Sequence, residues 1–252
     1  MEMMEVGLKD RLWHAMRQDL QRFMPALGGT SLLMCCACGR LLTQEQFSLE
    51  HVISQRALAD DPEEIKKKIT KNERAGTLLL CRAPLKIRGK VVYANGCNSW
   101  KGKFYDRPLR EILNGRAVSG QNRRLLAVHS IAVMAVAYLG MVARYGYQAV
   151  LTQSGLPMRQ QFFIPGRFHR DMPIRCQIAL IGVPPTGYDE EHAEFWTNPM
   201  SFEYDAGICR VGFRNVVTTL PCSRDPEVPI ARHLPIKPAR YTLRPDFRTA
   251  FE

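Results

Sequence analysis

The 252-residue sequence has few histidines and shows no recognisable export signal. It contains six histidines, so a histidine placed beside another ionisable residue stands out. Its first residues, MEMMEVGLKDRLWHAM, include early acids where an export signal has a basic start and a continuous apolar run. We therefore expect a cytoplasmic protein, in which cysteines stay reduced.

Long apolar runs are also lacking, with one exception at residues 125–142. This segment, LLAVHSIAVMAVAYLGMV, has a length at the lower limit for a membrane-spanning helix. His129, Ser130 and Gly140 lower its hydrophobicity, and its many alanines suit a tightly packed helix. The sequence predicts a long buried helix here and no membrane partner.

Acidic residues are outnumbered, and the basic excess is concentrated in one part of the chain. The formal net charge is +11, and residues 31–120 carry 16 basic against 9 acidic residues. A protein with a pI near 9.5 fits a polyanionic partner, because phosphates bound by Lys and Arg release counterions. A solvated basic surface without a partner is the plainer alternative. The 46 % apolar content suffices for a core and disfavours a disordered chain.

The pattern of apolar residues predicts an α+β fold. Helical spacing runs from Leu8 to Met24, short strand-like segments surround the sequence CCACG, and residues 83–96 alternate as a hairpin. A helix is expected after Cys97, and a mostly β region after the long buried helix. The strand-like segments of that last region are residues 148–152, 160–165, 176–183, 209–213 and 216–220. The predicted parts are a lead-in helix at 1–30, a zinc-stabilised domain at 31–118 and an accessory α+β domain at 119–252.

Four of the eight cysteines have the arrangement of a structural zinc site. Cys35 and Cys38 form a C-x-x-C followed by glycine, a turn in which two thiolates converge on one ion. Fifteen residues separate Cys81 from Cys97, and the predicted hairpin between them brings its two ends together. We expect these four cysteines to bind one Zn²⁺. Unpaired thiols in a reduced core are an alternative, and a redox-active pair is disfavoured because no βαβ pattern surrounds it.

Glu50 and His51 place an acid and a histidine side by side in the stretch SLEHVISQ. Hydrolysis of a phosphodiester needs a water to lose a proton near neutral pH, and a neutral imidazole can accept it. It also needs a hard cation at the phosphate, held by oxygen or nitrogen ligands. Adjacent residues of a strand point to opposite faces, so the pair suits two separate tasks. The plainer alternative is a surface pair without function.

The order of these motifs resembles the HNH endonuclease family. C-x-x-C, the acid–His step, LLLC and CNSWKG follow one another over residues 34–106. The resemblance implies a ββα-metal fold, in which two strands and a helix surround one catalytic divalent ion. It implies His51 as the general base, with Glu50 and Asn98 as ligands of Mg²⁺ or Mn²⁺. The substrate it implies is DNA.

Lys101 follows Asn98 by three residues, so both are expected on one face of a helix, where Lys101 can reach a phosphate. We expect Lys103 to contribute to the same nucleic-acid contact. The middle asparagine of the family, which orients the base, has no direct counterpart, because Gly76 occupies its place. Asn72 and Asn95 are the nearest candidates.

Three functions are compatible with these motifs. The first is a metal-dependent endonuclease that hydrolyses DNA. The second is a zinc-stabilised nucleic-acid-binding module with an inactive nuclease centre. The third is a protein-interaction scaffold with a structural zinc site, which predicts no salt-sensitive binding to DNA. The sequence leaves association into a homo-oligomer open.

Overall fold

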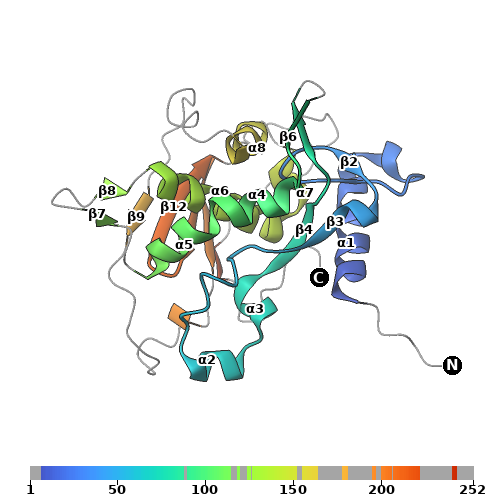
Figure 1. Cartoon of the computed structure of the whole chain (residues 1–252). Helices are drawn as coiled ribbons and strands as arrows, with labels where there is room; N and C mark the ends of the chain where they lie inside the picture. Colours follow the sequence, from blue (N-terminus) through green and yellow to red (C-terminus); the bar gives the residue numbers. More distant parts are fainter. Residues whose placement is uncertain are drawn as a thin grey trace.

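The computed structural model has an α+β architecture, as predicted (Figure 1). It describes residues 7–87, 90–114, 118–119, 124–125, 127–151, 155–163, 178–180, 195–196, 200–205, 207–221 and 240–242. The N-terminal helix lies toward one end of the molecule, and a five-stranded sheet lies toward the other (Figure 1). The long helix α6 (Ala127–Tyr145) contacts both helix α5 (Asp106–Leu113) and strand β12 (Val216–Pro221) of that sheet.

Helix α1 (Leu8–Phe23) forms where the sequence predicts a helix, because its apolar residues recur on one face. Leu12, Met16 and Leu20 are buried on that face. A 3-10 turn, η1 (Pro25–Leu27), follows the helix. Helix α1 packs against strands β1 (Leu33–Met34) and β4 (Thr77–Cys81), which carry or adjoin cysteines of the predicted zinc site.

Three antiparallel strand pairs build the cysteine-rich region. They are β1 with β2 (Leu41–Leu42), β3 (Phe47–His51) with β4, and β5 (Leu85–Ile87) with β6 (Lys90–Tyr93). The short helices η2 (Gln44–Gln46), α2 (Glu63–Lys68) and α3 (Lys71–Ala75) lie before and between β3 and β4. The β5–β6 pair confirms the hairpin predicted at residues 83–96. Helix α4 (Gly96–Phe104) follows and contacts β4, so two strands and a helix pack together.

A glycine holds the start of α4 close to the end of β4. Gly96 has a φ of +74°, and a Cβ at this position would lie 2.5 Å from the carbonyl carbon of Arg82. A side chain is therefore excluded both by the left-handed backbone and by the lack of space. This close approach brings Cys97 beside Cys81.

The C-terminal region is an antiparallel sheet with the strand order β13–β10–β11–β12–β9. Its other strands are β9 (Ile178–Leu180), β10 (Ser201–Asp205), β11 (Ile208–Phe213) and β13 (Arg240–Thr242), and the short pair β7 (Val118–Ser119) and β8 (Arg124–Leu125) precedes α6. The strands predicted at 176–183, 209–213 and 216–220 are confirmed by β9, β11 and β12. Those predicted at 148–152 and 160–165 are wrong, because helices α7 (Tyr147–Val150) and α8 (Gly155–Phe163) occupy these positions. Short apolar runs do not distinguish a strand from a buried helix.

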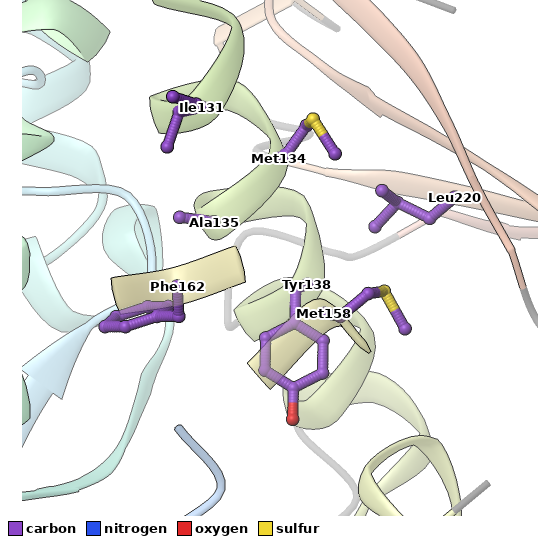
Figure 2. Close-up of a pocket in the computed structure, with 7 residues that line it drawn as sticks. All are labelled: Ile131, Met134, Ala135, Tyr138, Met158, Phe162 and Leu220. Carbon is purple, nitrogen blue, oxygen red and sulfur yellow. The ribbon is translucent and has the colours of Figure 1, made fainter. Parts of the chain in front are cut away.

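Helix α6 confirms the predicted buried helix and is tied to the CCACG turn. Tyr138 of α6 donates a hydrogen bond to the Cys36 carbonyl at 2.7 Å, and Tyr147, on the following helix α7, donates one to the Met34 carbonyl just before the turn. Within the part of the chain that the structure describes, no helix is long and apolar enough to cross a membrane. Figure 2 shows the gap between α6, α8 and β12, lined by Tyr138, Met158 and other apolar side chains. This gap of about 10 Å³ has room for about one water and is too small for a ligand.

Candidate metal centre and active site

Four cysteine sulfurs converge where the CCACG turn, the end of β4 and the start of α4 meet. The Sγ atoms of Cys35, Cys38, Cys81 and Cys97 all lie within 4.8 Å of one another. The Cys81–Cys97, Cys38–Cys81 and Cys35–Cys97 separations are 3.2, 3.6 and 3.8 Å. A tetrahedral zinc ion with Zn–S bonds of about 2.3 Å sets its sulfurs about 3.8 Å apart. The cluster can therefore hold a metal ion such as zinc, and the four thiols form no disulfide.

Arg40 brings positive charge to the four-cysteine cluster. Its guanidinium lies 3.3 Å from the sulfurs of Cys38 and of Cys81, and also bonds two backbone carbonyls after β4. Hydrogen bonds from the neighbouring thiols lower the pKa of Cys38 and of Cys81, and Arg40 lowers that of Cys38 further. Burial raises the pKa of Cys35 and Cys97. Two sulfurs thus favour the thiolate form, and a bound metal would displace the protons of the other two.

Glu50 lies on the buried face of β3 and pairs with Lys101. Its carboxylate is 2.6 Å from Lys101 Nζ, which is also 3.3 Å from the Asp106 carboxylate and donates to the His51 carbonyl at 2.9 Å. Burial raises the pKa of Glu50, and Lys101 offsets this only in part. Burial acts to lower the pKa of Lys101, but the two carboxylates outweigh it and raise that pKa. A group of two carboxylates and one ammonium holds protons tightly because its excess charge is negative.

This placement corrects the phosphate contact expected of Lys101. The side chain is 1 % exposed and is neutralised by carboxylates, so its charge does not face a phosphate at the surface. Two residues further along α4, Lys103 is exposed, and its ammonium lies over the rings of Tyr93 and Phe104. A contact between Lys103 and nucleic acid stays a prediction.

The two residues predicted to hold a catalytic divalent ion, Glu50 and Asn98, are each bound to other protein groups. The amide nitrogen of Asn98 donates to the Leu49 carbonyl at 2.7 Å and to Ser48 Oγ at 3.0 Å, and so ties α4 to β3. Glu50 is engaged by Lys101. Among the described residues, the four cysteines are the only group of three or more acidic, histidine or cysteine side chains placed to hold a metal. An ion at Glu50 therefore requires that Lys101 be released.

His51 ends β3 and is half-buried, whereas the preceding Glu50 is buried, in line with the alternation of a strand. Its Nε2 lies 3.0 Å from Asn72 Oδ1 and 2.9 Å from Gln55 Nε2. An unprotonated Nε2 accepts a hydrogen bond from the Gln55 amide, and a protonated Nε2 donates one to Asn72. The ring therefore keeps a partner in both protonation states, as a group that takes up and releases protons requires.

Asn72 is the asparagine that contacts the histidine. It lies in the first turn of α3, which begins at a capping box between Thr70 and Glu73. Asn95, the other candidate, precedes α4, and its side chain makes no capping hydrogen bond there. Sequence reasoning missed Gln55 and Asp106, although they lie only four and five residues from His51 and Lys101, which they contact. Spacing alone does not identify such contacts outside a regular helix.

Comparisons of the chain with family models, curated proteins and solved structures give no match.

Proposed function

We propose that the protein is an endonuclease of the HNH type that hydrolyses phosphodiester bonds of DNA. The position of His51 carries the proposal, because the histidine ends a strand at the surface and two amide side chains hold its ring. The four-cysteine cluster supports it, since a metal there would fix β4 and α4 beside that strand. The basic excess of residues 31–120 suits a polyanionic substrate.

In this proposal His51 accepts the proton of the water that attacks the phosphate. General-base assistance of this kind contributes roughly a hundred- to ten-thousand-fold to the rate. Proton uptake at Nε2 exchanges a hydrogen bond from Gln55 for one to Asn72, so neither state leaves the nitrogen unsatisfied. Dependence on Mg²⁺ or Mn²⁺ is part of the proposal, as a requirement that the cleavage assay tests.

The test is cleavage of supercoiled plasmid in the presence of Mg²⁺ or Mn²⁺. The protein is expected to nick or linearise the plasmid, and His51→Ala is expected to reduce the rate at least about a hundredfold. His14→Ala is the matched control, because His14 is exposed on α1 and should be replaceable without effect. The proposal is overturned if the protein cleaves none of the DNA substrates with any of the ions. It is also overturned if His51→Ala and His14→Ala cleave equally.

A second function is favoured by the ion pair between Glu50 and Lys101. Because the carboxylate beside His51 is already neutralised, the chain also fits a zinc-stabilised nucleic-acid-binding module with an inactive nuclease centre. That function predicts salt-sensitive DNA binding without cleavage, unchanged in His51→Ala. DNA binding that is absent at every salt concentration contradicts both functions and favours a protein-interaction scaffold.

A further inference from the structure

A basic cavity lies beside His51, between the loop after β3 and the helices α2 and α3, which Figure 1 shows below the β3–β4 pair. The cavity measures about 390 Å³. Its wall carries Arg56, Lys66, Lys71 and Arg74, and none of the described residues that line it is acidic. A hollow lined by charges of one sign concentrates ions of the opposite sign, so the cavity attracts anions.

Two of the four basic residues of the wall have no acidic partner among the described residues, and a third has a well-screened one. Among the residues that the structure describes, no carboxylate pairs with Arg56 or Lys71, and both side chains are exposed. Lys66 pairs with Glu63, whose carboxylate is 71 % exposed and therefore well screened by water. Glu73, on α3, accepts a hydrogen bond from the Thr70 backbone within the capping box.

The floor of the cavity adds to this charge. Arg74 is buried and pairs with Asp61, but the same carboxylate oxygen also pairs with Arg214 at 3.0 Å. One carboxylate thus serves two guanidinium groups, which leaves an excess positive charge beneath the cavity. Nη1 of Arg214 is buried without a hydrogen-bond partner in the described residues, so Arg214 is incompletely compensated.

The cavity is connected to His51 at two points. Gln55 lines the cavity and its amide nitrogen lies 2.9 Å from His51 Nε2. Lys71, which also lines the cavity, is followed directly by Asn72, whose side-chain oxygen lies 3.0 Å from the same nitrogen. A molecule seated between Arg56 and Lys71 therefore extends toward the imidazole.

We infer that this cavity binds one backbone phosphate of a nucleic-acid strand, next to the phosphodiester that faces His51. The inference rests on the proposed function and deepens it. Arg56, Lys66 and Lys71 donate charge-assisted hydrogen bonds to the phosphate oxygens, and the excess charge around Arg74 attracts them from below. The volume lies within the range of about 300–1,000 Å³ of pockets for small molecules, which accommodates the phosphate with its sugar.

The experiment measures binding of a short fluorescent single-stranded DNA to the full-length chain as salt increases. All variants carry His51→Ala, so that cleavage does not interfere. Neutralising one phosphate site with Arg56→Gln, Lys66→Gln and Lys71→Gln together should weaken binding several-fold. It should also reduce the slope of log affinity against log salt by about 0.7, the value for one phosphate on a single strand. Lys71→Gln alone is measured in parallel, in case the triple variant folds poorly.

The matched control removes three charges outside the cavity. Lys67, Lys86 and Lys90 are exposed and do not line it, so Lys67→Gln, Lys86→Gln and Lys90→Gln together should leave the slope unchanged. Equal loss in the two triple variants means that general surface charge binds the strand, and overturns the inference. The same holds if Lys71→Gln and the cavity triple both bind like the parent.

Cleavage assays with the same cavity and control variants, made in protein that keeps His51, separate this inference from the proposed function. If the parent protein never cleaves DNA, and the cavity variants lose binding while the control does not, the cavity inference stands and the nuclease proposal fails. If cleavage depends on His51 and the cavity variants bind like the control, the nuclease proposal stands and the cavity inference fails.

Discussion

Two clusters of largely buried charged side chains lie near His51, and they have opposite compositions. The acidic cluster consists of Glu50, Lys101 and Asp106. The basic cluster consists of Asp61, Arg74 and Arg214. The first places one cation between two carboxylates, and its cation touches the His51 carbonyl. The second places one carboxylate between two cations, beneath the cavity that Gln55 links to the histidine.

The two clusters can relieve their excess charge in different ways. A carboxyl group with a raised pKa, such as that of Glu50, takes up a proton when its partner is lost. A guanidinium keeps its proton at any pH that proteins tolerate, so the basic cluster needs a carboxylate or another anion. The side of His51 near Lys101 therefore favours protons and cations, whereas the side near Arg74 favours anions such as phosphate.

We propose that the four-cysteine cluster binds one Zn²⁺, and removing that ion should have the largest effect, because it should destabilise the acidic cluster more than the basic cluster. Structural zinc sites contribute on the order of 10 kcal/mol of folding free energy in small domains. Cys97 lies on α4 with Lys101, so chelation or Cys97→Ser should release α4 from β3 and break the acidic cluster. No member of the basic cluster adjoins a cysteine ligand.

Hydrogen exchange of peptides from α4 and α3, together with a metal content near one zinc per chain, checks this prediction. Amides of α4 should exchange much faster after metal removal, while those of α3 keep most of their protection. Equal loss of protection in both helices would show that the two clusters depend on the metal alike.

The next largest effect is expected for Asp61→Asn, because it leaves two buried guanidinium groups facing each other. Removing one partner of a buried ion pair costs about 3–5 kcal/mol, and this variant has no protonation step that reduces the cost. Asp60→Asn is the control, because Asp60 pairs with Arg110 at the surface and is expected to contribute far less. Urea denaturation of both variants gives the comparison, and equal midpoints would contradict it.

A smaller loss of unfolding free energy than in Asp61→Asn is expected for Lys101→Met, although this variant breaks an equally buried ion pair. Protonating Glu50 costs about 1.4 kcal/mol for each pH unit above its ordinary pKa, so at pH 7 the electrostatic loss is limited to about 3.5 kcal/mol. Lys103→Met, on the exposed side of the same helix, is the control. A loss in Lys101→Met that clearly exceeds that of Asp61→Asn would refute the difference between the clusters.

The backbone around the cysteines could be predicted from local sequence because each element there has its own signal. A glycine precedes Cys97, a C-x-x-C turn contains Gly39 with positive φ, and the acid–His step alternates on its strand. The short apolar runs at 148–152 and 160–165 carried no such signal. Their conformation depends on packing against α6, which α7 and α8 both contact. Strand β10 was not predicted, and it lies between the two strands β11 and β13 with which it pairs.

The candidate site could be predicted as a set of nearby residues but not as a set of contacts. The spacing of Asn98 and Lys101 placed both on one helix face, yet the carboxylates of Glu50 and Asp106 decide that Lys101 is buried. The choice of Asn72 over Asn95 required the path of α3 back to His51. The basic cluster joins Asp61 to Arg214, and a pairing across 153 residues leaves no trace in a local pattern.

The smallest expected effect is a pH dependence that distinguishes the clusters. The pKa of Glu50 is raised in the folded protein, so the folded state binds its proton more tightly, and stability is gained as pH falls toward the unfolded value near 4.5. Loss of Lys101 raises that pKa further. The deficit of Lys101→Met should therefore shrink by up to about 2.7 kcal/mol between pH 7 and pH 5, whereas that of Asp61→Asn stays constant because guanidinium groups do not titrate there. Urea midpoints of Lys101→Met and Asp61→Asn, measured at both pH values, test this difference. A deficit of Lys101→Met that grows toward pH 5 would mean that Glu50 stays ionised without its partner.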